Sequence, residues 1–422
     1  MPKSIAYFPY EEPIIRTPHA TITIDGDANF SNRALLEGWP GDGSPEHPFV
    51  IDGFEINKGG ETGPCVWIRN TRVSFTISNC NITGASSASG WLNFTFSHWG
   101  GGIILENVTN GELVNNTCNS NNEWGILLFN SKSITVSNNI CNNNKYGIIL
   151  YAYYEYNVFN TVINNRCFNN TEFGIFLSVG FSGFQCNNTI FNNTCTLNGK
   201  SGIHLNYLSY YNTVANNTCN SNGINGISLE SSYLNTIANN TCNSNGSNGI
   251  ALENSDSNIV ANNTCNSNEF RGIDLYRSDS NTVFDNICNS NTGGIYLGRS
   301  SSNIIMNNIC NNNEFHGILT YDSDSNTITN NICLNNAATT ETPIPTTTTT
   351  PTPTTPTTTA TISPMTTSPI LPYIGFIDII LLGVAWKLLS ERRGFNESST
   401  RSMIQLGKRL REMMNTELEE RV

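Results

Sequence analysis

Short apolar runs alternate with polar corners along most of this chain, and neither shows a helical period. The unit GISLESSYLNTIANNTCNSNGSN, residues 226–248, is representative: Ile227 and Leu229 alternate to one side, and Ile237 and Cys242 follow after polar turns. Short runs in which apolar and polar residues alternate, bounded by turns rich in Asn, Ser and Gly, are typical of short strands. Each unit therefore predicts three short strands and three turns.

The unit returns about every 23 residues, a period typical of solenoids. Every copy carries Gly-Ile-x-Leu or a close variant, starting at Gly102, Gly125, Gly147, Gly174, Gly202, Gly226, Gly249, Gly272, Gly294 and Gly317. Three short strands bury their apolar side most simply by winding into a coil that stacks on its neighbours, about 4.8 Å away. We predict an all-β fold, a right-handed parallel β-helix over residues 63–336, with corner Asn side chains hydrogen-bonded in ladders.

A cysteine takes one fixed position in ten units, in phrases such as NNTCNSN. These are Cys118, Cys141, Cys167, Cys195, Cys219, Cys242, Cys265, Cys288, Cys310 and Cys333. Stacked cysteines would hold their Cβ atoms one strand spacing apart, farther than the roughly 3.8 Å of a typical disulfide. We favour a ladder of free, buried thiols acting as small apolar groups; a metal row or a catalytic thiol is the alternative. Cys65, Cys80 and Cys186 fall outside this column.

The C-terminal region predicts attachment to a membrane. Residues 337–369 form a Thr/Pro-rich tract, typical of an extended O-glycosylated stalk or of a bare linker. Residues 370–389 are mostly apolar and long enough to cross a bilayer, and Arg392 and Arg393 follow them. We predict a single transmembrane helix at 370–389, a cytoplasmic tail at 390–422 and an extracellular solenoid.

Residues 1–62 are expected to lead into the solenoid and cap it. Their first 20 residues lack the apolar core of a secretory signal, so we expect the natural start to lie upstream. Sequons of the form Asn-x-Ser/Thr agree with an exterior location, at Asn81, Asn93, Asn107, Asn115, Asn169, Asn187, Asn192, Asn216, Asn239 and Asn262. A net charge of −12 with only 21 basic residues argues against nucleic acid as a partner.

The Gly-Ile-x-Leu and Asn-x-Cys coils resemble the NosD-like, carbohydrate-binding and sugar-hydrolase (CASH) β-helix repeats of the pectin-lyase-like superfamily. IDGDANF (residues 24–30) and GWPGDGSPEHPFVIDGFEI (residues 38–56) are similar to the motif that precedes such helices in archaeal surface proteins. The resemblance covers about residues 20–336 and implies the fold, which hosts many functions. It includes a copper-maturation protein, but the histidines here are scattered and form no cluster with Met. Its enzymes use carboxylates, Arg and often calcium, and none of their motifs matches residue by residue.

Aromatic residues gather just after the Gly-Ile-x-Leu strand in two lengthened coils and in the next coil. Insertions at one corner of a solenoid collect on one face, often a binding face, and Tyr rings suit stacking on sugars. The predicted carbohydrate-binding residues are Tyr153, Tyr154, Tyr156, Phe181, Phe184, Tyr207, Tyr210 and Tyr211. The alternative is that these rings pack on one another and only cover the solenoid.

Acidic residues form shorter columns. Glu230 and Glu253 share one position in adjacent units, and Asp256, Asp279 and Asp324 recur in SDSN corners. Stacked carboxylates can share Ca²⁺ or a proton, and Glu230 with Glu253 is the candidate pair for glycosidase chemistry. We favour solvated or corner-capping carboxylates, without an assigned catalytic residue, metal site or cofactor.

These patterns favour a membrane-anchored surface protein that binds or scaffolds, with a polysaccharide or glycan as the favoured ligand and surface proteins as further partners. A surface polysaccharide lyase or glycoside hydrolase is the first alternative, and a structural envelope component is the second. Turnover of a polysaccharide distinguishes the first alternative from binding alone.

Overall fold

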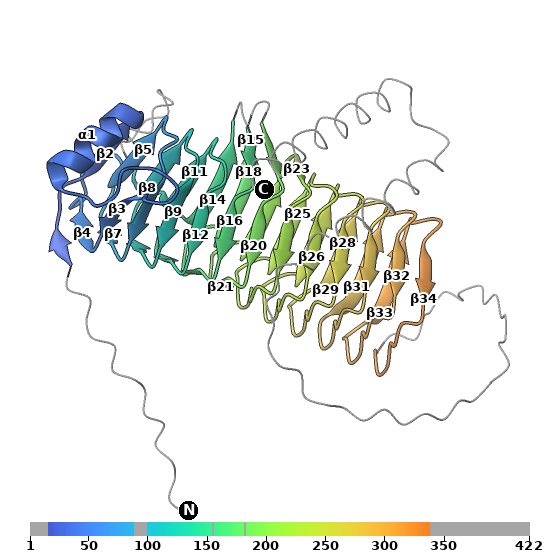
Figure 1. Cartoon of the computed structure of the whole chain (residues 1–422). Coiled ribbons are helices and arrows are strands. Elements are labelled where there is room, and N and C mark those ends of the chain that lie inside the picture. Colours follow the sequence, from blue (N-terminus) through green and yellow to red (C-terminus); the bar gives the residue numbers. More distant parts are fainter. Residues whose placement is uncertain (1–15, 88–98, 154–155, 181–182, 338–422) are drawn as a thin grey trace, which may run out of the picture. The chain divides into compact units, whose positions relative to one another are not determined.

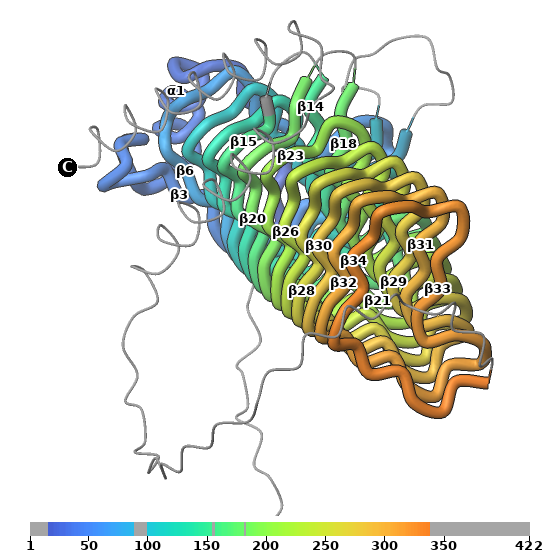
Figure 2. The backbone as a smooth tube through the Cα atoms, turned by 90° about the vertical axis from the view of Figure 1, so that its right-hand side faces the viewer, coloured from blue at the N-terminus to red at the C-terminus, as the bar shows by residue number. Residues whose placement is uncertain are grey.

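The computed structural model describes residues 16–87, 99–153, 156–180 and 183–337, which form a right-handed parallel β-helix of about 11 turns (Figures 1 and 2). The predicted fold is confirmed. The predicted transmembrane helix and tail, and the predicted stalk beyond Ala337, lie outside the described residues. Among the described residues, no helix has the length and apolar character needed to cross a bilayer.

Sheet 1 is built from the Gly-Ile-x-Leu segments and has 12 parallel strands. They are β2 (Ile22–Asp25), β5 (Val66–Arg69), β8 (Gly101–Glu106), β11 (Trp124–Phe129), β14 (Tyr146–Ala152), β18 (Ile175–Val179), β22 (Ile203–Asn206), β25 (Ile227–Glu230), β27 (Ile250–Glu253), β29 (Arg271–Tyr276), β31 (Gly293–Gly298) and β33 (His316–Tyr321).

Sheet 2 follows sheet 1 in each coil and also has 12 strands. They are β3 (Phe49–Asp52), β6 (Phe75–Ser78), β9 (Gly111–Val114), β12 (Thr135–Ser137), β16 (Thr161–Ile163), β20 (Thr189–Phe191), β24 (Thr213–Ala215), β26 (Thr236–Ala238), β28 (Ile259–Ala261), β30 (Thr282–Phe284), β32 (Ile304–Met306) and β34 (Thr327–Thr329).

Sheet 3 closes each coil with the cysteine-bearing segments, and a small side sheet arises from the lengthened coils. The strands of sheet 3 are β1 (Thr17–Pro18), β4 (Phe54–Asn57), β7 (Asn81–Thr83), β10 (Thr117–Asn119), β13 (Ile140–Asn142), β17 (Arg166–Phe168) and β21 (Thr194–Thr196), continued by single bridges from Thr218 to Ile332. The side sheet contains β15 (Tyr156–Val158), β19 (Phe184–Cys186) and β23 (Ser209–Tyr210).

The core is a set of apolar rows that run along the solenoid axis. In one coil Ile227 and Leu229 of sheet 1, Ile237 of sheet 2 and Cys242 of sheet 3 are all fully buried. Each stacks on its counterpart in the next coil, because strands pair in register, as Leu229 does with Leu252. Burial of such a side chain contributes roughly 1.5–3 kcal/mol, so most of the stability of a coil comes from its neighbours.

Asparagine ladders hold the corners, as predicted. The backbone N–H and Nδ2 of Asn217 both donate to Oδ1 of Asn240, at 2.9 and 3.0 Å. Asn240 repeats the pattern toward Asn263 and also donates from Nδ2 to the Val214 carbonyl at 2.9 Å. A buried amide left unpaired costs about 1–3 kcal/mol, so this repeated pairing explains why buried Asn is tolerated at every corner.

The ten column cysteines stack along the inside of sheet 3, and all thirteen cysteines are free thiols. Burial raises the pKa of the Cys141 thiol well above its ordinary value, which keeps it neutral. The glycine that opens each unit packs against this column: a Cβ on Gly249 would lie 2.7 Å from Cβ of Cys265 and 2.6 Å from the Gly272 carbonyl oxygen. Gly and Cys together therefore let adjacent coils approach closely.

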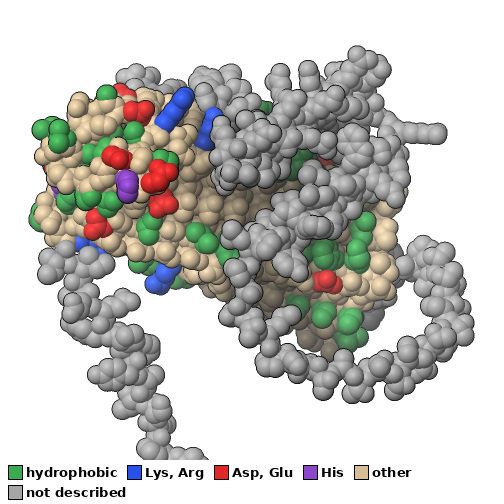
Figure 3. All heavy atoms as spheres, viewed as in Figure 1, with side chains coloured by type: hydrophobic (Ala, Val, Ile, Leu, Met, Phe, Trp, Pro, Cys, Tyr) green, Lys and Arg blue, Asp and Glu red, His purple; other side chains and the backbone are tan. Residues whose placement is uncertain are grey.

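A helix closes the N-terminal end of the core. In α1 (Asp27–Glu37), Phe30 is fully buried, and its ring lies 5.2 Å from those of both Phe49 and Phe75. Acidic and hydrophobic side chains are visible at this end in Figure 3, while much of the remaining described surface in that view is neither charged nor hydrophobic. This agrees with a chain in which only 13% of residues are charged.

Candidate functional site

The outward face of sheet 1, hereafter the outer face, carries two separate groups of large side chains. Alternate residues of each strand point outward, and register pairing stacks them into columns. The first group, the aromatic tract, lies over β5 to β22. It consists of Trp67, Trp99, Trp124, Phe129, Tyr146, Tyr151, Phe173, Phe176 and His204.

The rings of the aromatic tract pack on one another. Tyr146 stacks on Phe176 with centroids 5.7 Å apart, and Phe173 stacks on Phe176 at 4.9 Å. Ile104 and Leu127 are almost completely buried among such rings although they point away from the solenoid core. The tract is therefore a second hydrophobic layer, with little room between its members.

His204 ends the tract. Its ring is stacked 4.8 Å from that of Phe173, almost parallel, and Nε2 lies 3.9 Å from Oε2 of Glu230. Burial, together with the charge of Lys200, lowers the pKa of His204 to about 4. The imidazole is consequently neutral at pH 7 and acts as another flat ring.

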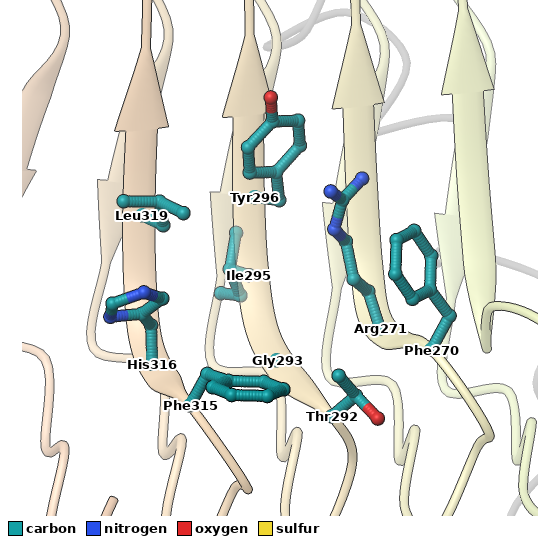
Figure 4. Close-up of a pocket in the computed structure, with 9 residues that line it drawn as sticks. All are labelled: Phe270, Arg271, Thr292, Gly293, Ile295, Tyr296, Phe315, His316 and Leu319. Carbon is teal, nitrogen blue, oxygen red and sulfur yellow. The ribbon is translucent and has the colours of Figure 1, made fainter. Parts of the chain in front are cut away.

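The second group surrounds a hollow over β29, β31 and β33, the Gly293 pocket. Arg271, Gly293 and His316 are register neighbours, so one column lacks a side chain in the middle (Figure 4). The hollow has a volume of about 250 Å³. Its lining residues are Phe270, Arg271, Thr292, Gly293, Ile295, Tyr296, Phe315, His316 and Leu319.

Arg271 is held rigidly at one wall of the Gly293 pocket. Its guanidinium carbon lies 3.5 Å from the ring centre of Tyr296 and 4.2 Å from that of Phe270. Nη1 of Arg271 also donates to Oδ2 of Asp274 at 2.9 Å. Two cation–π contacts and an ion pair fix a planar donor group whose remaining N–H groups can serve a ligand.

Asp274 has an unused acceptor. Its Oδ1 is buried and accepts no hydrogen bond from the described residues. Burial raises the pKa of the Asp274 carboxyl, Arg271 opposes this effect, and the charge of Glu253 adds to it. A buried acceptor of this kind costs about 1–3 kcal/mol. Asp274 is not among the residues that line the hollow, and its contact with the pocket is through Arg271.

The residues predicted to bind carbohydrate are spread over several places. Tyr153 stacks with Tyr151 at the edge of the aromatic tract, whereas Phe184 lies on the side sheet beside Tyr210. Tyr207 and Tyr211 are 56% and 40% exposed. Tyr156 belongs to β15, in register with Phe184, and Tyr154 and Phe181 lie outside the described residues.

The acidic columns are also resolved. Glu230 and Glu253 are register neighbours and both are exposed. At the SDSN corner, the Asp279 backbone N–H donates to Oδ1 of Asp256 at 2.7 Å, and Ser301 donates likewise to Asp279. Asp256 and Asp279 thus cap the backbone of the following coil, and Asp324 extends the column through Ser301.

Metal ligands do not cluster in the part of the chain that the structure describes: no three His, Cys, Asp or Glu side chains there are placed to hold one ion. The described acidic corners use their oxygens as backbone caps instead.

Comparison with known proteins identifies the fold family. A sequence profile described as periplasmic copper-binding protein (NosD) matches residues 181–314 and 272–341, and one described as right handed beta helix region matches residues 46–241. The A-module of mannuronan C-5 epimerase AlgE4 from Azotobacter vinelandii superposes with a TM-score of 0.51 at 13% identity, over 72% of this chain and 90% of that one. The chain is a right-handed parallel β-helix protein, and each of the two profiles matches less than half of it.

Other comparisons add detail to this β-helix assignment. The A-module of AlgE6 from the same organism gives a TM-score of 0.50 at 13% identity, over 72% of this chain and 93% of that one. No curated protein matches the sequence significantly. At such identities the likeness shows the fold alone, and the resemblance drawn from the repeats is confirmed at that level.

The Gly293 pocket was not among the predicted sites of this β-helix. Most of its residues occupy three positions that vary between units: the two residues before the repeated glycine and the x of Gly-Ile-x-Leu. The sequence does carry a signal, because the doubled glycine of TGGIYLG removes the side chain that Arg271 and His316 supply in neighbouring units. A glycine that interrupts a column of outward side chains therefore indicates a hollow on this face.

Proposed function

We propose that this chain is a membrane-anchored cell-surface protein whose β-helix binds carbohydrate on the outer face, with one sugar ring in the Gly293 pocket. The single observation that carries the proposal is the hollow at Gly293, whose aromatic walls flank the fixed guanidinium of Arg271. Sugars offer a flat apolar face and hydroxyl oxygens, which match the aromatic walls and the N–H groups of Arg271. The pocket is slightly smaller than the roughly 300–1,000 Å³ of drug-sized sites, which favours a single ring.

Membrane attachment rests on residues 370–389, their apolar composition and the basic residues that follow. A matching profile described as periplasmic fits a solenoid outside the membrane. The Thr/Pro-rich residues before this segment would separate the binding face from the bilayer.

A retention assay tests the binding proposal. The full-length chain in detergent is passed over immobilised polysaccharides, and the Asp274→Asn and Gly293→Trp variants are compared with Ala238→Trp, which adds the same ring to the outward side of sheet 2. We expect wild type and Ala238→Trp to be retained by the same polymer and Gly293→Trp to lose at least tenfold in affinity. Equal retention of all variants would contradict the proposal.

A polysaccharide-modifying enzyme is the second candidate, favoured by one observation: the pKa of the Asp274 carboxyl is raised beside a fixed arginine. Raised carboxyl pKa values are typical of general acids and bases. The same columns are assayed for new reducing or unsaturated ends. Product that disappears in Asp274→Asn, or in the Glu230→Gln and Glu253→Gln variants, would identify an enzyme.

A further inference from the structure

The corner between sheets 2 and 3 carries a column of exposed asparagines, and it is the one corner of the coil that does not border sheet 1. Two polar residues form this corner in each coil, as Asn239 and Asn240 do. Asn240 is buried and belongs to the ladder. Asn239 is exposed, has φ of 56°, and forms no side-chain hydrogen bond to the described residues.

Five coils add a threonine two residues after the exposed asparagine. The sequons so formed begin at Asn115, Asn192, Asn216, Asn239 and Asn262. Bridges hold the four later threonines, from Thr194 to Thr264, in one row. In the other coils that carry the cysteine column, the equivalent position is isoleucine or arginine, as at Ile140, Arg166 and Ile287. All five exposed asparagines have φ between 53° and 57°, so they present the amide in the same way.

We infer that this corner is an N-glycosylation edge, occupied at Asn115 and at non-adjacent coils of the block formed by Asn192, Asn216, Asn239 and Asn262. The inference rests on the proposed extracellular location. The chemistry is transfer from a lipid-phosphate-linked oligosaccharide: an Asn Nδ2–C1 bond forms, the C1–O bond to phosphate breaks, the lipid phosphate leaves and Nδ2 releases one proton.

Modification spares the fold because the ladder does not use these amides. Asn217, Asn240 and Asn263 keep every ladder hydrogen bond when their exposed neighbours carry sugar. Asn192 donates from Nδ2 to Oδ1 of Asn164, and a glycosylated amide still retains one N–H for this bond.

The distance between adjacent coils limits how many of these sequons can carry a glycan in one molecule. Adjacent coils lie about 4.8 Å apart, which is less than the breadth of a branched glycan. Two neighbouring sequons therefore compete, and the block of four holds at most two glycans, never on adjacent coils. At this corner position Asn115 has no such competitor, because neither Asn79 in the coil before nor Asn138 in the coil after is followed two residues later by Thr or Ser. The glycans leave the outer face uncovered and hydrate a weakly charged surface.

Site-specific mass spectrometry tests both the N-glycosylation of this corner and the limit of two glycans in the block. The full-length chain is exported from an N-glycosylating host cell behind a host leader, and both glycopeptides and intact protein are measured. We expect Asn115 to be modified and no molecule to carry more than two glycans in the block. Thr218→Ile with Thr264→Ile removes the sequons at Asn216 and Asn262 and should raise Asn192 and Asn239 toward full occupancy, whereas Thr218→Ser with Thr264→Ser should not.

The residues equivalent to Thr218 and Thr264 in two later coils are Ile287 and Ile309, so isoleucine is compatible with the fold at this position. Unmodified asparagines on a solenoid that external protease can digest would overturn the inference and leave the proposed location standing. Three or four glycans within the block of one molecule would overturn the occupancy rule. A solenoid protected from external protease would overturn the proposed location, and this inference with it.

Discussion

The aromatic tract and the Gly293 pocket lie on the same face of the same sheet and differ by one interruption. In the tract, the position before the repeated glycine holds Trp124 and Tyr146 in successive coils, and rings fill the surface. In the pocket that column reads Arg271, Gly293 and His316, and a hollow of about 250 Å³ appears. On a regular solenoid, a hollow can therefore arise where a stack is broken.

The largest expected effect separates packing from binding. Trp124 is 5% exposed within the aromatic tract, so Trp124→Ala should lower the free energy of unfolding by about 4 kcal/mol, as buried ring truncations do. Chemical denaturation measures this loss. Retention on polysaccharide at low denaturant should persist, since Gly293 in β31 lies seven strands away from Trp124 in β11 along sheet 1. Lost retention with unchanged stability would move the binding site into the tract.

Gly293 and Gly294 are consecutive in the sequence, but a side chain at each position would have different neighbours. A Cβ on Gly294 would lie 2.2 Å from the Gly317 carbonyl oxygen and 2.7 Å from Cβ of Cys310, so Gly294→Ala should cost about 3 kcal/mol of stability. A Cβ on Gly293 would meet nothing closer than 3.7 Å. Gly293→Ala should therefore keep the melting temperature and weaken only ligand binding. Equal destabilisation by both substitutions would show that Gly293 is a packing glycine too.

Acid should loosen the tract at His204. The folded pKa of about 4 lies below the unfolded value near 6.5, so the unfolded chain binds more protons in this window and stability falls as pH drops from 6.5 to 4. The loss is on the order of 3 kcal/mol. It should shrink in His204→Phe, which keeps the stacked ring. Melting curves at pH 7 and pH 4 measure it, and parallel curves for both proteins would contradict a buried neutral imidazole.

The smallest expected effect on stability lies in the pocket itself. Phe315 is 49% exposed, so Phe315→Ala should change the free energy of unfolding by less than about 0.5 kcal/mol. Its ring lines the pocket, and loss of stacking worth about 1 kcal/mol should weaken sugar binding roughly fivefold. Tyr321→Ala, on an exposed ring outside the lining, is the control. Calorimetric titration decides, and equal affinities for both variants would remove Phe315 from the site.

The repeat made the fold predictable, because each unit has the same pattern of strand residues, corner residues and inward apolar positions. Ile227, Leu229 and Cys242 face inward as the alternation requires, and Asn240 pairs along its ladder. The outward positions were harder, since they obey no period. The aromatic residues that accumulate in the insertions, such as Tyr153 and Tyr210, were recognisable from the sequence as candidates, whereas the hollow left by a missing side chain at Gly293 was not predicted.

Burial was a second quantity that the sequence could not provide. Asp274 reads as a surface carboxylate after Gly-Ile, yet the structure places its Oδ1 out of contact with solvent and beside Arg271. Arg271, in turn, is fixed by rings that come from its own coil and from the next one, Phe270 and Tyr296. Such convergence depends on register between coils, which fixes the neighbours of each outward residue only once the strands are aligned.

A crystal structure with an oligosaccharide cut from a retained polysaccharide tests the central claim most directly. We predict a sugar ring over Gly293, with a hydroxyl group within hydrogen-bond distance of the Arg271 guanidinium and an apolar face against Tyr296 or Phe315. Sugar density over the side sheet at Phe184 and Tyr210, with the Gly293 pocket empty, would contradict the account.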